Sequence, residues 1–469
     1  MKIVTAMLAA MLALLSPMAG ATDAPGLSLP PYERVQLDNG ATVLLLRKPD
    51  VPLIATQILV RGGTLADGAG KEGTAAILAD LLGKGAGGRD ALQYAQAIDG
   101  VGGRIGFGAW REAITVDASF LARDADLMLE LVADALLRPK LDAAEFDKLR
   151  KRAIQSLAAA KDGDPRGLVG TYGQAWLFRG HPYGRPQTGD ERTLAGLKID
   201  DVVAFYRDHL GADRTTIAIA GDFDPAAMRA RVDKAFGRWN KAAAALPDVP
   251  AKLRENGRRV LLVDKPGATQ TYFWAGNVGV SEHDPARAAQ DLVQTVFGGR
   301  FTSMLNTELR VKSGLSYGAS ASLQRLAQPG YAAFSSFTRT EATAEAIDLA
   351  FATLAKLHAE GIDAETLASA KRYVLGQFAP EYETADQLAG AIAQLDLYGQ
   401  PKELIDGYGA RIQAATAADV AAARAAFATP ADTLLVAIGD AAKIRDAVAK
   451  YGPVTEMKIA DPGFAPPPE

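Results

Sequence analysis

An internal repeat with a fixed spacing constrains the fold of this chain more than any other feature. The apolar segment TTIAIAGD at residues 215–222 returns 218 residues later as TLLVAIGD, at residues 433–440. At the same spacing, the apolar triplet 43–45 returns at 261–263, and Asp201-Val202 returns as Asp419-Val420. A period of this length indicates two domains of one fold, because solenoid repeats are much shorter.

The apolar spacing predicts both strands and helices within each half. In the first half we expect strands at 42–47 and 53–61, and helices at 73–82, 125–137, 146–160 and 200–210. In the second half we expect a helix at 343–360 that ends at Gly361. The pattern favours an α+β fold with two homologous domains, each a mainly antiparallel sheet with helices packed on one face.

Domain limits follow from changes in composition. The segment 241–257, KAAAALPDVPAKLRENG, is rich in Ala, then contains Pro, then is charged, as is typical of a linker. We therefore expect domains at 28–240 and 258–460, arranged as half of a clam-like shell. The Pro-rich tail 461–469 is expected to be disordered.

The first residues have the pattern of a secretory signal peptide. Lys2 precedes an apolar stretch at 3–15, and small residues at 19–21 predict cleavage after Ala21. The apolar stretch is too short to span a bilayer, so we expect no membrane anchor in the mature protein. If the source is a Gram-negative bacterium, the protein is expected to be periplasmic.

Composition excludes several classes of function. The chain has no Cys, so it can form neither a disulfide framework nor a thiolate metal site. It has 51 Lys and Arg against 55 Asp and Glu, and this slightly acidic balance argues against a nucleic-acid partner. Its four histidines are scattered, with no pair four residues apart (His181, His209, His283 and His358).

Residues 305–321, LNTELRVKSGLSYGASA, form a candidate binding element. We expect a helix at 303–311, a stop at Gly314, and a strand at 315–323. This order places Arg310 at a helix end and Tyr317 near the start of a strand, where a guanidinium with five donors and a phenol can face one cleft. A structural role explains both residues as well, with Arg310 at the negative end of the helix dipole and Tyr317 packed in a sheet.

The same segment resembles the L-R-x-x-x-G-L-x-Y segment of the insulinase/pitrilysin-like metallopeptidases, the inverzincins. In that family, the Arg and the Tyr bind the substrate backbone beside the zinc. The resemblance implies that Arg310 and Tyr317 bind substrate. It spans nearly the whole mature chain and includes Arg61-Gly62-Gly63 and the segment HPYG at 181–184.

The zinc-binding half of the family site is degenerate. Residues 73–85, GTAAILADLLGKG, resemble the family segment G-x-A-H-x-x-E-H-x-x-x-K-G, in which two His bind zinc and the Glu is the general base. The two His positions fall on Ala76 and Asp80, and the Glu position falls on Ala79. The third ligand of the family falls near Gln155, whose neutral amide is a weak zinc ligand. The resemblance therefore implies neither a metal nor a catalytic residue in this chain.

The chain keeps only the substrate-binding half of the family site, which suggests that a second chain supplies the zinc-binding half. The resemblance implies a non-catalytic, substrate-binding subunit, inactive by itself. Its homologous partner would carry H-x-x-E-H, hold the zinc and cleave peptide substrates. The alternative is a stand-alone peptide-binding or scaffold protein of the same fold. A self-sufficient hydrolase with other ligands would need a cluster of His and carboxylates, and the sequence shows none.

Overall fold

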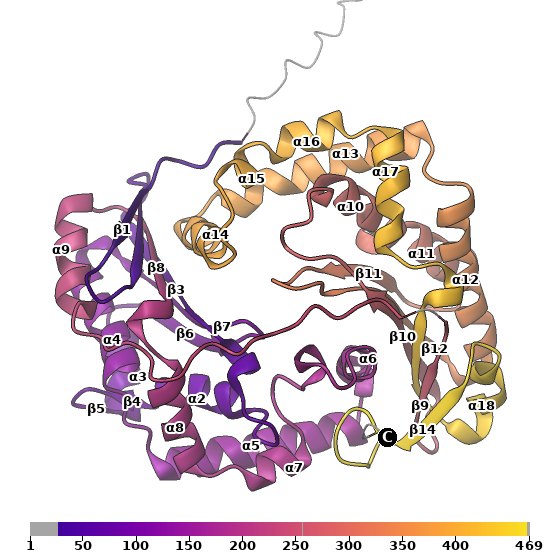
Figure 1. The fold of residues 1–469 in the computed structure, drawn as a ribbon, viewed down its shortest axis with the longest axis horizontal. Coiled ribbons are helices and arrows are strands. Elements are labelled where there is room, and N and C mark those ends of the chain that lie inside the picture. Colours follow the sequence, from indigo (N-terminus) through magenta and orange to yellow (C-terminus); the bar gives the residue numbers. More distant parts are fainter. Residues whose placement is uncertain (1–26, 256, 467–469) are drawn as a thin grey trace, which may run out of the picture.

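Two six-stranded sheets form the centre of the molecule (Figure 1). The computed structural model describes residues 27–255 and 257–466, so the predicted signal peptide lies outside the described residues. The first sheet has the order β1 (Glu33–Gln36), β2 (Thr42–Arg47), β8 (Thr215–Gly221), β3 (Leu53–Arg61), β7 (Ala113–Leu121), β6 (Arg104–Ala109). The second has the order β11 (Ala319–Gln324), β12 (Tyr331–Arg339), β10 (Gln270–Val278), β13 (Leu434–Gly439), β9 (Val260–Asp264), β14 (Val454–Lys458).

Helices surround both sheets. Those of the first half are α2 (Thr74–Leu82), α3 (Ala91–Asp99), α4 (Ala125–Leu137), α5 (Ala143–Asp162), α6 (Val169–Leu177), α7 (Glu191–Gly196), α8 (Ile199–His209) and α9 (Pro225–Phe236). Those of the second half are α10 (Arg287–Gln294), α11 (Met304–Asn306), α12 (Thr343–Ala359), α13 (Ala364–Phe378), α14 (Ala385–Leu397), α15 (Glu403–Asp406), α16 (Tyr408–Ala414), α17 (Ala417–Ala423) and α18 (Ala441–Ala449). A short hairpin, β4 (Gly85–Ala86) with β5 (Arg89–Asp90), follows α2.

The two sheets have the same topology, which confirms an α+β fold with two homologous domains. Five strands correspond in order: β2, β8, β3, β7 and β6 match β9, β13, β10, β12 and β11. In both sheets the first two of these strands are parallel, and the others pair antiparallel. The sixth strand differs, because β1 pairs antiparallel with β2 whereas β14 pairs parallel with β9.

The spacing of 218 residues is wrong by one residue at the first strand of the repeat. Val43 pairs with Ile217 in the first sheet, and Val260 pairs with Leu435 in the second. Ile217 and Leu435 are 218 residues apart, so Val43 corresponds to Val260 and not to the predicted Leu261. A shift of one residue moves a side chain to the other face of a sheet. Apolar residues fill both faces of β2 and β9, and the pattern of apolar residues therefore could not fix the register.

Local capping explains why α5 begins earlier than predicted. The helix predicted at 146–160 is longer in the structure, because the Asp142 side chain accepts hydrogen bonds from the backbone of Ala144 and Glu145, both at 2.9 Å. The helix α4 has the limits predicted from its apolar spacing. The strands β2 and β3 also begin and end at the predicted residues.

Each sheet has a second apolar face that is covered by a helix from the other domain. Helix α14 of the second domain packs on β3 and β8 of the first sheet, through Leu388 and Ile392. Helix α6 of the first domain packs on β10 and β13 of the second sheet. The contact of α6 is close, since a Cβ at Gly173 would lie 2.4 Å from the ring of Trp274. Neither domain therefore closes its core without the other.

A partly buried polar junction joins the two domains around Glu112. This carboxylate lies in the β6–β7 hairpin and accepts hydrogen bonds from the hydroxyls of Tyr183 at 2.7 Å and Tyr398 at 2.8 Å. It also accepts from the backbone N–H of Ala327, in the β11–β12 hairpin, at 3.1 Å. Burial and the Glu112 charge raise the pKa of both tyrosines. The junction connects one hairpin of each sheet with the end of α14.

The prediction of a disordered tail is wrong for residues 461–466. Phe464 is 4% exposed and packs edge-on against Tyr172 of α6, with ring centroids 5.1 Å apart. Lys161 donates to the carbonyls of Asp461 and Gly463 at 2.9 and 3.3 Å. The Pro-rich composition did not predict this order, because it depends on tertiary contacts of Phe464 and of the tail backbone with the first domain. Residues 467–469 lie outside the described part of the chain.

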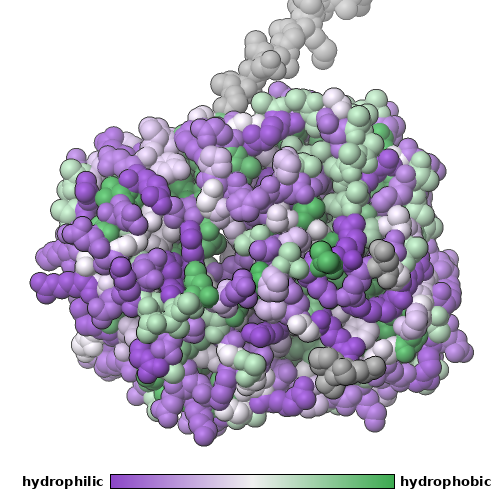
Figure 2. Space-filling view, viewed as in Figure 1, coloured by the Kyte–Doolittle hydropathy of each residue, from purple (hydrophilic) through white to green (hydrophobic). Residues whose placement is uncertain are grey.

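The surface is mostly hydrophilic on the face seen in Figure 2, with small scattered hydrophobic groups. Among residues 27–255 and 257–466, every helix is too short or too polar to cross a membrane.

We predict that a substitution in α14 loosens the sheet of the other domain. Ile392 is fully buried, and Ile392→Ala should lower the free energy of unfolding by about 2–5 kcal/mol. Hydrogen exchange should become faster in β3 and β8, because α14 covers these strands. The exposed Asp386 of the same helix provides the control, and Asp386→Ala should change neither measurement by much. Faster exchange confined to α14 would contradict the prediction.

Candidate functional site

The structure brings Arg310 and Tyr317 together. The guanidinium carbon of Arg310 lies over the Tyr317 ring, 4.6 Å from its centroid, and also over the Phe301 ring, 4.7 Å from its centroid. Both rings are at the surface, with Tyr317 76% and Phe301 58% exposed. In the described part of the chain, no hydrogen bond or ion pair engages the Arg310 guanidinium. Its in-plane N–H donors therefore remain available to a ligand.

A widened helical turn carries Arg310. The predicted helix at 303–311 consists of α11, capped by the Ser303 side chain, and the π-helix η7 (Thr307–Lys312). In η7 the Ser313 N–H bonds to the carbonyl of Glu308, five residues earlier, at 3.2 Å. π-Turns are rare overall, but those that occur are often found at functional sites. The turn ends at the predicted stop, Gly314, whose φ of 66° is the left-handed conformation that favours glycine at a helix end.

The strand predicted at 315–323 begins later, at Ala319, so Tyr317 lies in a turn before it. The Ser316 hydroxyl donates to the carbonyl of Gly318 at 2.9 Å and accepts from the N–H of Gly318 at 3.1 Å. These local bonds compete with the pairing of a sheet. Because Tyr317 lies in this turn, its ring is exposed and contacts Arg310. In a strand, the alternation of side chains would have placed the ring on one face of the sheet.

Helix α2 forms as predicted but has no metal site. Ala76 is partly buried, Ala79 is 1% exposed, and Asp80 is exposed to solvent. Gln155 is also exposed, on α5, which packs against α2. Methyl groups carry no lone pair for zinc, and one carboxylate is a poor site. Within residues 27–255 and 257–466, no group of three His, Asp or Glu side chains could hold a metal. The residues present do not fit the zinc of the family.

A buried carboxylate holds the N-terminus of α2. Asp67 is 3% exposed and accepts hydrogen bonds from the backbone of Gly73 and Ala75, both at 2.9 Å. Burial raises the pKa of this carboxyl from 3.8 to about 7, although the two hydrogen bonds and Arg185 act in the opposite direction. The helix is thus fixed by its cap and its apolar packing, independently of any metal.

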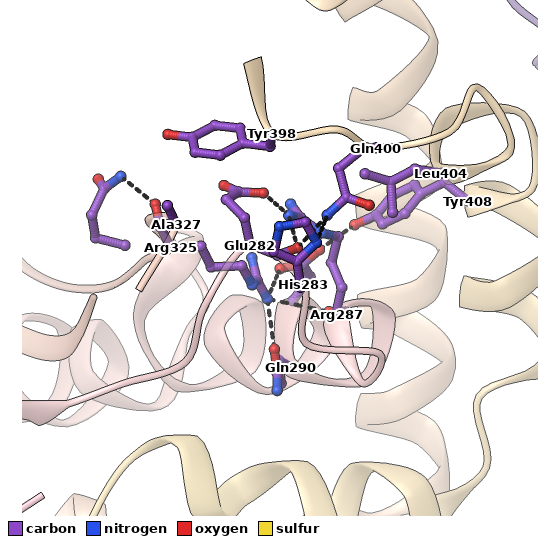
Figure 3. Close-up of polar contacts among 12 residues, drawn as sticks. Glu282, His283, Arg287, Gln290, Arg325, Ala327, Tyr398, Gln400, Leu404 and Tyr408 are labelled. Atoms are coloured by element: carbon purple, nitrogen blue, oxygen red, sulfur yellow. Dashed lines mark hydrogen bonds and ion pairs between the residues drawn. The ribbon is translucent and has the colours of Figure 1, made fainter. Parts of the chain in front are cut away.

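Two cavities lie beside α14, and no pattern in the sequence predicted them. One of about 690 Å³ lies between α10, α13, α14 and α16, and one of about 730 Å³ lies between the two sheets. Glu282 and Tyr398 line both. The charges of their common wall are paired. Arg287 donates to Glu282, as Figure 3 shows. Arg325 forms an ion pair with Asp291 at 2.8 Å. Arg310 and Tyr317 line neither cavity.

The family follows from comparison with known proteins. The model of the insulinase family (peptidase family M16) matches residues 42–191, and that of the peptidase M16 inactive domain matches residues 196–374. An uncharacterized zinc protease of Mycobacterium leprae is 30% identical over 298 residues, which cover 63% of this chain and 67% of the relative. The chain belongs to the insulinase family. The family that the sequence motifs indicated is therefore confirmed.

Solved structures share the fold of this insulinase-family chain. A peptidase M16 inactive domain from Pseudomonas fluorescens has a TM-score of 0.82 at 22% identity, covering 87% of this chain and 98% of that one. A protease from Helicobacter pylori has a TM-score of 0.81 at 20% identity, covering 88% and 100%. At these identities the likeness concerns the fold alone.

We predict that the purified protein contains no stoichiometric zinc and does not cleave unfolded peptides by itself. The reason is that Ala76, Ala79 and Asp80 stand where two ligands and a base are needed. Elemental analysis of the metal-supplemented, desalted protein tests this. One tightly bound zinc per chain, together with activity that a chelator abolishes, would contradict it.

We also predict a pH dependence of stability from Asp67. Because its pKa is higher in the folded chain than its ordinary 3.8, the folded protein binds the proton more tightly than the unfolded chain does. This contribution is fully present below about pH 4 and is lost as the pH rises through about 7. Over this window, the free energy of unfolding should fall more for the natural protein than for Asp67→Asn, measured in urea. Identical pH profiles would contradict the prediction.

Proposed function

We propose that this chain is the non-catalytic, substrate-binding subunit of a heterodimeric zinc metallopeptidase of the insulinase family. One observation carries the proposal: the Arg310 guanidinium is oriented by two rings, with its donors free, in a chain whose zinc-ligand positions hold Ala76 and Asp80. The homologous partner would carry H-x-x-E-H and the zinc. Relatives named zinc proteases and a structural neighbour named an inactive domain support such a pairing.

The chemistry expected of Arg310 and Tyr317 is recognition of a peptide backbone. A guanidinium donates up to two parallel hydrogen bonds to carbonyl oxygens, and the phenol donates one more. Fixing the peptide in this way lowers the entropic cost of placing its scissile carbonyl at the partner's active site. No step of bond cleavage is assigned to this chain.

The place of action proposed is the periplasm. The predicted signal peptide supports export, and a chain without Cys does not depend on the redox state of its compartment. Peptide fragments of exported proteins are the substrate class consistent with that location.

We predict that Arg310→Ala lowers peptide turnover by the assembled pair by about one to three orders of magnitude. A hydrogen bond to a charged group contributes about 1.5–3 kcal/mol, and its loss also loosens the attack geometry. Tyr317→Phe should have a smaller effect, because the ring that contacts Arg310 remains. The measurement is steady-state cleavage by the complex recovered from the native host through a tag on this chain.

The control for this prediction is Asp80→Ala, which removes an exposed charge from α2 and should leave turnover unchanged. Full activity of both the Arg310→Ala and the Tyr317→Phe complexes would show that the pair is structural. Recovery of this chain without a homologous partner would instead favour the stand-alone peptide-binding or scaffold protein.

A further inference from the structure

Phe301 contacts Arg310 as closely as Tyr317 does, although no motif singles it out. Its ring centroid lies 4.7 Å from the guanidinium carbon, and 58% of the residue is exposed. An exposed aromatic residue adds little to a core, so packing does not explain its place. Val311, which follows Arg310 in the sequence, is also exposed, at 62%, but offers the guanidinium no ring face.

The backbone around Phe301 is tied to the element that carries Tyr317. Ser303 is fully buried, and its N–H bonds to the carbonyl of Arg300 at 3.0 Å, which closes a turn around Phe301. The Asn306 side chain donates to the same carbonyl at 3.5 Å and accepts from the N–H of Ala319 at 3.0 Å. One side chain therefore connects the Phe301 turn with the start of β11, next to the Tyr317 turn.

Contact with ring faces leaves the guanidinium edge free. Cation–π attraction acts between the face of a ring and the charge, and it uses none of the in-plane N–H donors. A carboxylate at the same place would occupy these donors and neutralise the charge. Two rings therefore restrict the rotamers of Arg310 without competing with a ligand for its hydrogen bonds.

We propose that Phe301 is a positioning residue, which together with Tyr317 holds the Arg310 guanidinium in the orientation that receives the peptide backbone. This inference rests on the proposed function and deepens it. The substrate-binding element then consists of three residues from two turns and a π-helix. Phe301 acts through Arg310, and its own contact with the peptide is not required.

The experiment measures kcat/KM of the tagged complex with one fluorogenic peptide. Phe301→Leu keeps an apolar side chain but removes the ring face, and we expect kcat/KM to fall about two- to fivefold, as expected for an exposed cation–π contact. Phe301→Trp restores a ring face and should recover the activity. Val311→Ala removes exposed apolar surface beside Arg310 without altering a ring, and should leave kcat/KM unchanged.

A double-mutant cycle separates positioning from other roles. If Phe301 acts through Arg310, adding Phe301→Leu to Arg310→Ala should cause no further loss. The inference is overturned if Phe301→Leu has full activity, or if its loss is the same in the Arg310→Ala background. A crystal structure of the Phe301→Leu chain in which the guanidinium keeps its place over Tyr317 would also overturn it.

The outcomes distinguish this inference from the proposed function. Loss of turnover with Arg310→Ala but not with Phe301→Leu overturns the role of Phe301 alone. Full turnover with Arg310→Ala contradicts the proposed function, and the proposed role of Phe301 is then contradicted as well.

Discussion

Helices α6 and α14 each cover a sheet of the other domain, and the rest of the structure depends on this exchange. A sheet with two apolar faces needs cover on both, and the helices of its own domain provide only one layer. Leu388 and Ile392 of α14 complete the first core, whereas α6 completes the second. Because each helix must leave its own domain, the two domains are fixed relative to each other, and hollows remain beside α14.

The polar contacts between the domains follow from the same arrangement. Once the two sheets face each other, the β6–β7 and β11–β12 hairpins meet at Glu112, where two tyrosine hydroxyls and a backbone N–H satisfy the carboxylate. Even a half-buried carboxylate would be costly without these partners, because it has lost part of its hydration. The tail around Phe464 adds a third connection, by packing on α6. The edge strand β11 leads from this junction back to the turn of Tyr317, so the binding element is attached to a fixed frame.

The two halves of the family site have different physical characters in this chain. Helix α2 retains its apolar packing and its Asp67 cap, and it serves the core although its ligand positions hold Ala76 and Asp80. In contrast, the rings beside Arg310 are exposed and contribute little to the core. The fold needs the residues of α2, whereas the exposed rings beside Arg310 fit the recognition role proposed for them, since aromatic and Arg residues are enriched at binding surfaces. This difference is the physical basis for proposing a binding role without a catalytic one.

Local pattern in the sequence determined the repeat, the limits of β2, β3 and α4, and the identity of the residues at the zinc positions. The strand and helix limits depend on side chains close together in the chain, whose spacing reports directly on period and chemistry. The repeat is visible because its two copies keep similar residues in the same order. Contacts between distant segments decided the rest. The register of β9 followed from pairing with β13, because a strand apolar on both faces does not specify its own register. The order of the tail depended on the packing of Phe464 against Tyr172 and on the hydrogen bonds of Lys161 to the tail backbone. Phe301 and Arg310 are close in the sequence, but their contact depends on a turn and a π-helix that the sequence pattern did not predict, and only the folded structure places the guanidinium carbon 4.7 Å from the ring centroid.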